Sequence, residues 1–139
     1  MTTFTVAWGR DDTQPDGQHS VQVSTVAELD DVLDRIEATG AAFAVDIYRT
    51  DDPHEIPYGL QLGVGHQHRP FLLYAGDAPA GGLGVDTAVE EWPEDIEFDT
   101  GGEPTGYGPD RTRVTAEQAR HAAGEYVTTG RRPTTGTWN

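Results

Sequence analysis

Alternating polar and apolar side chains recur along the chain and predict a series of short strands. In residues 3–8 the alternation places Phe4, Val6 and Trp8 on one face. The same two-residue period predicts strands at residues 20–24, 42–48, 58–64 and 71–75, another around Ile96 and Phe98, and a short one that ends at Trp138. The glycine-rich residues 78–84 and the glycine- and proline-rich residues 100–110 are expected to be loops.

Two segments follow the helical period instead, and each begins with a capping-box pattern. Thr25 and Glu28 start the first, in which each side chain can bond the other residue's amide, and the apolar positions that follow predict a helix over residues 26–39. Thr115 and Gln118 start the second, which is expected to run to about residue 129. The sum is an α+β fold: a single antiparallel sheet of about six or seven strands with two helices on one face. We expect residues 1–139 to form one domain, because the C-terminal part is too short to fold alone.

Charge and composition narrow the possible functions. Asp and Glu number 24 against nine basic residues, all of them arginine, which gives a formal net charge of -15. Such a field repels nucleic acid and anionic lipid and attracts basic partners. The absence of cysteine excludes disulfides, thiolate zinc sites and cysteine nucleophiles. With no apolar targeting segment in residues 1–20 and no stretch near the roughly 20 apolar residues of a membrane span, we expect a soluble, cytoplasmic protein.

Catalytic patterns are weak throughout the sequence. Ser20 and Ser24 are the only serines, the chain has no lysine for a phosphate loop, and no set of nucleophile, base and orienting residue stands out. We therefore expect no catalytic residues, no cofactor and no enzymatic activity. His66 and His68, with His54 nearby in the sequence, leave open an alternative: a small metal- or ligand-binding protein, or a minor enzyme, that uses this segment.

The acidic residues are densest between residues 70 and 110, a stretch with ten carboxylates and neither lysine nor arginine. Aromatic side chains interleaved with charge are typical of protein–protein hot spots, and Trp92 lies within this stretch. The candidate partner-binding residues are Asp77, Glu90, Glu91, Trp92, Glu94, Asp95, Glu97 and Asp99. Two plainer interpretations stay open: a solvated loop whose Trp92 fills the core, and adaptation of the whole chain to high salt.

Three stretches of the chain are similar to one protein family. The first is residues 23–34, Val-Ser-Thr-Val-Ala-Glu-Leu-Asp-Asp-Val-Leu-Asp, a short strand that runs into an acidic capped helix. The second is the apolar segment 71–77, Phe-Leu-Leu-Tyr-Ala-Gly-Asp, together with the glycine-rich residues that follow it. The third is residues 119–129 followed by Gly-Arg-Arg-Pro133 and a strand that closes on Trp138. Over nearly its full length the chain resembles Imm family one, the first of the immunity-protein families of bacterial polymorphic toxin systems.

The resemblance implies an α+β domain without catalysis or cofactor. Members of the family are encoded beside a toxin, often one with a nucleic-acid deaminase domain, and bind it to protect the producing cell. A deaminase or nuclease toxin needs a basic surface for its substrate, so the acidic stretch 86–103 is expected to cover that surface, with Trp92 as an apolar anchor. Asp77 and the loop at residues 51–55 are further candidates for the contact. The expected partner is thus a basic toxin domain, not nucleic acid or membrane, and the free protein is expected to be a monomer.

Overall fold

The alternating segments form strands, and the two capped segments form helices. The computed structural model describes residues 2–15, 17–50, 59–66, 69–75, 82–134 and 137–138. Its elements are β1 (Phe4–Trp8), β2 (His19–Val23), α1 (Val26–Ala38), β3 (Phe43–Arg49), β4 (Gly59–Val64), β5 (Leu72–Ala75), β6 (Gly82–Val85), β7 (Ile96–Thr100), β8 (Glu103–Tyr107), α2 (Ala116–Thr129) and β9 (Thr137–Trp138). The α+β class, with an antiparallel sheet and two helices, is therefore confirmed.

Within the described residues the strands join into one nine-stranded sheet. Its main order is β2-β1-β3-β4-β5-β6-β9, and every neighbouring pair along it is antiparallel. The β7–β8 hairpin lies off this order and meets β3 through a single parallel pairing of Phe43 with Asp99. Because adjacent residues of a strand face opposite sides, this register divides the side chains of β3, β4 and β5 between two different environments.

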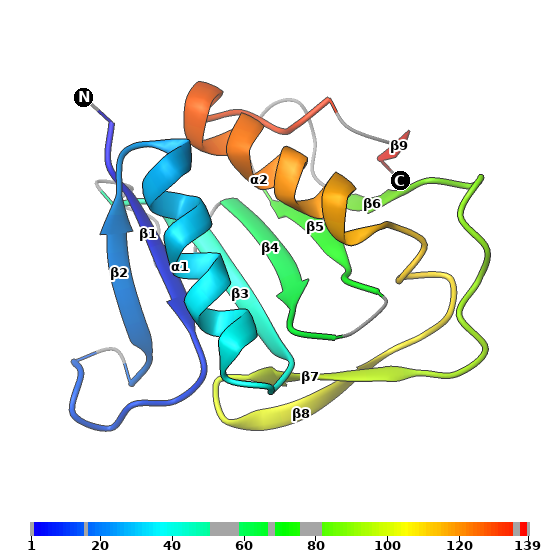
Figure 1. Cartoon of the computed structure of the whole chain (residues 1–139), viewed down its shortest axis with the longest axis horizontal. Helices are drawn as coiled ribbons and strands as arrows, with labels where there is room; N and C mark the ends of the chain where they lie inside the picture. Colours follow the sequence, from blue (N-terminus) through cyan, green and yellow to red (C-terminus); the bar gives the residue numbers. More distant parts are fainter. Residues whose placement is uncertain are drawn as a thin grey trace.

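The two helices lie side by side on one face of the sheet (Figure 1). The Thr25 hydroxyl caps α1 by accepting from the Glu28 amide at 3.2 Å, while the Glu28 carboxylate accepts from the Ser24 amide at 3.0 Å rather than from that of Thr25. The predicted box of α2 is complete, with Thr115 and Gln118 bonded in both directions. None of the described helices has the length and apolar character needed to cross a membrane.

The main core fills the space between the helices and the sheet. The two-residue period of residues 42–48 predicts Phe43, Val45 and Ile47 to face inward. Val45 and Ile47 are fully buried in this core, and Phe43 packs against it partly buried. Leu60 and Leu62 of β4 are also fully buried there. The buried helical face consists of Leu29, Val32, Leu33 and Ile36 from α1 and Ala119, Ala122, Ala123, Tyr126 and Val127 from α2. This face agrees with the helical period predicted from the sequence.

A second, smaller core lies on the opposite face of the sheet, where the β7–β8 hairpin packs. Phe71 stacks on Tyr107 with ring centroids 3.9 Å apart, and Phe98 meets Phe71 edge-on at 5.0 Å. Ala44 and Ile96 complete its buried members. The hairpin approaches the sheet so closely that a Cβ at Gly63 would lie 2.5 Å from the Phe98 ring. It thus covers one part of the face that the helices leave bare.

Two segments that were expected to be loops contain strands, which raises the strand count above the predicted six or seven. Residues 82–85 form β6, which pairs with β5 over only two residues and with β9 over two more. Residues 103–107 form β8, because Gly101 and Gly102 adopt φ angles of 67° and 101° and make a tight turn back from β7. Paired glycines between strands are a hairpin signal, so the loop prediction for residues 100–110 was wrong in this part.

Candidate functional site

The predicted acidic residues lie on the connection from β6 to β7 and on β7 itself. Figure 1 shows this connection running down one side of the molecule, at the right of the view. Of the candidates, Trp92 and Asp99 are half-buried and the others are exposed, namely Glu90, Glu91, Glu94, Asp95 and Glu97. Asp77, the loop at residues 51–55, His54 and His68 all lie outside the described residues. We call residues 86–103 the acidic segment below.

Most of these carboxylates have no cation beside them in the part of the chain that the structure describes. Within the residues that the structure describes, Glu90, Glu94, Asp95 and Glu97 form no ion pair, and Glu91 lies 3.8 Å from Arg113. Asp99 differs, because its carboxylate accepts from the Gly102 amide at 2.7 Å and so holds the hairpin turn. The acidic segment therefore presents net negative charge to the solvent.

Two arginines hold the first part of the acidic segment by its main chain. The Arg113 guanidinium donates to the carbonyl oxygens of Thr87 and Val89, at 2.5 and 2.7 Å. The Arg69 guanidinium donates to the carbonyl oxygens of Glu90 and Thr112. Since carbonyl oxygens accept these hydrogen bonds, the two arginines hold residues 87–90 without using the Glu90 carboxylate. Sequence reasoning missed this anchoring, because both arginines lie outside the segment.

Asp86 anchors the start of the segment to α2. Its carboxylate accepts from the Ala88 amide at 2.9 Å and from the Gln118 side chain at 2.7 Å. These hydrogen bonds, from the amide first and the side chain second, lower the pKa of Asp86 below its usual range. Asp86 is thus a structural residue of the acidic segment and helps to fix the path of the charged residues that follow it.

Trp92 packs against the smaller core and remains half-buried. The Arg69 guanidinium lies 5.5 Å from its ring centroid, and the His66 ring meets it edge-on at 5.6 Å. His66 also accepts a hydrogen bond on Nδ1 from the Arg69 amide at 3.0 Å. Among the described residues there is no group of three or more His, Cys, Asp or Glu side chains placed to hold a metal ion.

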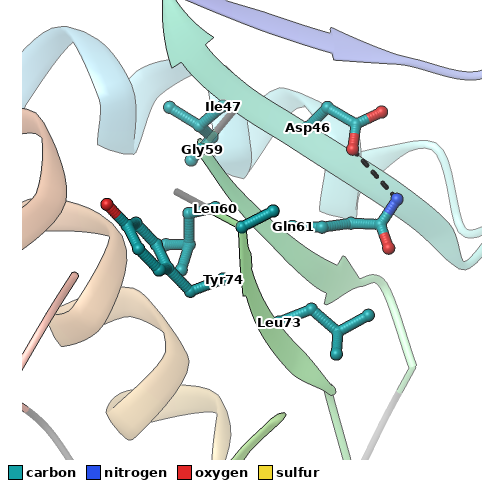
Figure 2. A pocket seen from close by; sticks show the side chains of 8 residues that line it. Asp46, Ile47, Gly59, Leu60, Gln61, Leu73 and Tyr74 are labelled. Carbon is teal, nitrogen blue, oxygen red and sulfur yellow. Dashed lines mark hydrogen bonds between the residues drawn. The ribbon is translucent and has the colours of Figure 1, made fainter. Parts of the chain in front are cut away.

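A feature that the sequence did not reveal lies on the bare face of the sheet, beyond the β7–β8 hairpin. Here β3, β4 and β5 surround an open hollow of about 420 Å³. Figure 2 shows Asp46, Gln61 and Leu73 pointing to one side of the sheet, while Leu60 and Tyr74 point to the other. The Gln61 Nε2 atom donates to the Asp46 carboxylate at 2.9 Å. In the sequence Asp46 occupies the outward position of a strand, where a solvated carboxylate is expected.

The electrostatic state of Asp46 is unusual for this protein. Burial raises the pKa of its carboxyl, and the hydrogen bond from Gln61 offsets only part of that effect. The pKa of Tyr107 is also raised, first by burial and then by the negative charge of Asp46. No cation pairs with Asp46 within the described part of the chain.

Replacing Asp46 with asparagine is expected to raise the free energy of unfolding at neutral pH. The pKa of Asp46 is higher in the folded protein than in the unfolded chain. The free energy of unfolding therefore falls as the pH rises from the unfolded-state pKa to the folded-state pKa, because the unfolded chain releases the proton first. The gain of Asp46→Asn over wild type should therefore be small near pH 4 and larger at pH 7. Urea unfolding across this range measures it. Asp31→Asn, an exposed neutralisation of equal charge, is the control, and an equal gain from it would contradict the prediction.

Comparison with known proteins assigns the chain to a family. The sequence model of the immunity protein family Imm1 matches residues 17–139, which include every element from β2 to α2 as well as β9. No curated protein and no solved structure matches the chain. Because the match spans well over half of the sequence, the chain belongs to the Imm1 family of immunity proteins, whose members are typically toxin inhibitors rather than enzymes.

Proposed function

We propose that this protein neutralises a nucleic-acid-targeting toxin, a deaminase or nuclease domain, by covering its basic substrate surface with the acidic segment. The protein would act in the cytoplasm of the producing cell, as a monomer that binds one toxin molecule. The observation that carries the proposal is the set of exposed carboxylates on an anchored loop, most of them without an ion pair to the residues that the structure describes, in a chain of formal net charge -15.

A toxin of this class needs a surface that the acidic segment complements. A domain that acts on DNA or RNA must hold phosphates and therefore presents a basic surface. A surface of opposite charge competes for it directly, and long-range attraction speeds the encounter. The main-chain anchors made by Arg69 and Arg113 support this role, because a loop that is already ordered loses little entropy on binding.

The first test is binding to the toxin domain encoded next to this gene, by pull-down at low and at physiological salt. A tight complex of one copy of each protein supports the proposal. A folded protein that binds no such domain at either salt concentration overturns it.

The second test removes the charge locally. The variant Glu90→Gln, Glu91→Gln, Glu94→Gln, Asp95→Asn should associate with the toxin at least about tenfold more slowly at low salt, because electrostatic steering contributes roughly 10- to 1,000-fold to association rates. The difference should shrink as salt screens the charges. The loop should keep its path, since Arg69 and Arg113 bind carbonyl oxygens and the anchoring carboxylate of Asp86 is unchanged. Stopped-flow association measures the rate.

The control separates local charge from net charge. The double variant Glu94→Gln, Asp95→Asn and the double variant Asp31→Asn, Glu117→Gln each remove two exposed carboxylates, the first pair within the acidic segment and the second on the helices. Only the removal of the first pair should slow association with the toxin appreciably. Equal rates for the two double variants would place the contact elsewhere on the molecule.

A further inference from the structure

The bare face of the sheet divides into a covered part and an open part. The β7–β8 hairpin covers Ala44 and Gly63, whereas the hollow over β3, β4 and β5 has no covering element among the described residues. Of the described residues that line the hollow, only Asp46 is charged. The walls around it are largely apolar and include Leu73 and Ala75. A single carboxylate in an otherwise uncharged hollow is an arrangement that selects a cation.

The Asp46 carboxylate has two acceptor oxygens in the hollow, and one of them accepts from Gln61. Gln61 Nε2 donates to Oδ1 of Asp46 at 2.9 Å, while the Gln61 carbonyl oxygen points to the far side of the amide from that carboxylate (Figure 2). The two oxygens of one carboxylate suit a planar group with paired N–H donors, the guanidinium of arginine, better than a compact ammonium. The apolar walls suit the methylene stem of the same side chain.

The free energy of the unbound protein favours binding of a guanidinium in the hollow. A partly buried carboxylate without a cation is costly, and Asp46 has only a neutral amide as its partner within the described residues. An arriving guanidinium supplies the missing charge and makes charge-assisted hydrogen bonds in a partly desolvated place, where they are strongest. The stability lost in the free protein is thus recovered on binding.

We propose that the hollow formed by Asp46, Gln61, Leu73 and Ala75 receives an arginine side chain of the bound toxin. The inference rests on the proposed function, since the toxin supplies the arginine. The hollow is a second contact with the toxin, in addition to the acidic segment, and its effect on binding is different. The acidic segment speeds capture of the toxin, and the hollow slows its release.

The first experiment needs no toxin. N-ethylguanidinium, a soluble mimic of the arginine side chain, is titrated into the isotope-labelled protein while NMR follows the Gln61 side-chain amide and the main-chain amides of Asp46 and Leu73. Saturable shifts that weaken at least about tenfold in Asp46→Asn, and that neutral N-ethylurea does not cause, support the proposal. No shifts, or shifts that persist in Asp46→Asn, overturn it. Equal binding of n-butylammonium overturns the choice of arginine.

The second experiment uses the complex. Asp46→Asn should leave the association rate within about twofold of wild type and raise the dissociation rate at least about tenfold, whereas Asp31→Asn should change neither. An unchanged dissociation rate overturns the inference. If the wild-type protein binds no toxin, the proposed function fails, while the guanidinium titration still decides whether the hollow is an arginine site.

Discussion

Phe98→Ala is expected to lower the free energy of unfolding by about 3–5 kcal/mol, the usual cost of truncating a fully buried phenylalanine. The Phe98 side chain has 0% exposure and joins the β7–β8 hairpin to the sheet. Its ring meets Phe71 at 5.0 Å and Tyr107 at 5.6 Å, both edge-on. Gly63 opposite it has no side chain that can move into the space. The cavity should therefore stay largely open.

Urea unfolding measures this loss, and Phe98→Leu is the control. Leucine keeps most of the buried volume, so its cost should be less than half of that of alanine. Native-state hydrogen exchange should show faster opening of β7 and β8 in Phe98→Ala than of β3 and β4, which the main core holds. A loss below about 1 kcal/mol would mean that the smaller core contributes little to stability.

Gly65→Ala is expected to cost about 2–4 kcal/mol, combining backbone strain with a steric clash. Gly65 has a φ of 104°, and a Cβ there would lie 2.1 Å from the carbonyl oxygen of Ala41. Because a backbone atom blocks the space, no side-chain rotation relieves the contact. The residues involved flank β3 and β4, the central pair of the sheet, so any shift displaces the start of their pairing.

Gly101→Ala provides the matched control for this second prediction. Gly101 also has a positive φ, 67°, but nothing lies within 4 Å of the position of its missing Cβ. Its substitution should cost only the strain of the left-handed conformation, about 1–2 kcal/mol. Thermal or urea unfolding of both variants separates the two contributions. Equal losses would show that the main chain near Ala41 adjusts without cost.

The main core was predictable because it depends on local periodicity. The alternation in residues 42–48 identified Val45 and Ile47 as inward, and the capping patterns at Thr25 and Thr115 located both helices. The smaller core was not predictable, because Phe71, Phe98 and Tyr107 come from three segments that only the tertiary fold brings together. The same limit hid β6 and β8, whose short pairings depend on partners already being in place.

The acidic segment and the hollow also differ in how far the sequence predicts them. The acidic segment was identified by counting charges, since a run of carboxylates is visible in any sequence. The hollow around Asp46 was missed, because alternation alone places this residue on an outward face, and its partial burial depends on Gln61 in the next strand. Asp46 is the one charged side chain among the described residues that line the hollow, and a sequence pattern does not encode this isolation.

The main-chain anchoring of the acidic segment has a consequence for how such a protein evolves. Arg69 and Arg113 bind carbonyl oxygens, which every amino acid provides, so the path of the loop is independent of its side chains at Glu90 and Glu91. Mutations at these positions therefore change what the loop recognises without changing where it lies. A lineage that meets a new toxin can revise its contacts residue by residue and keep a folded, protective protein at every intermediate step.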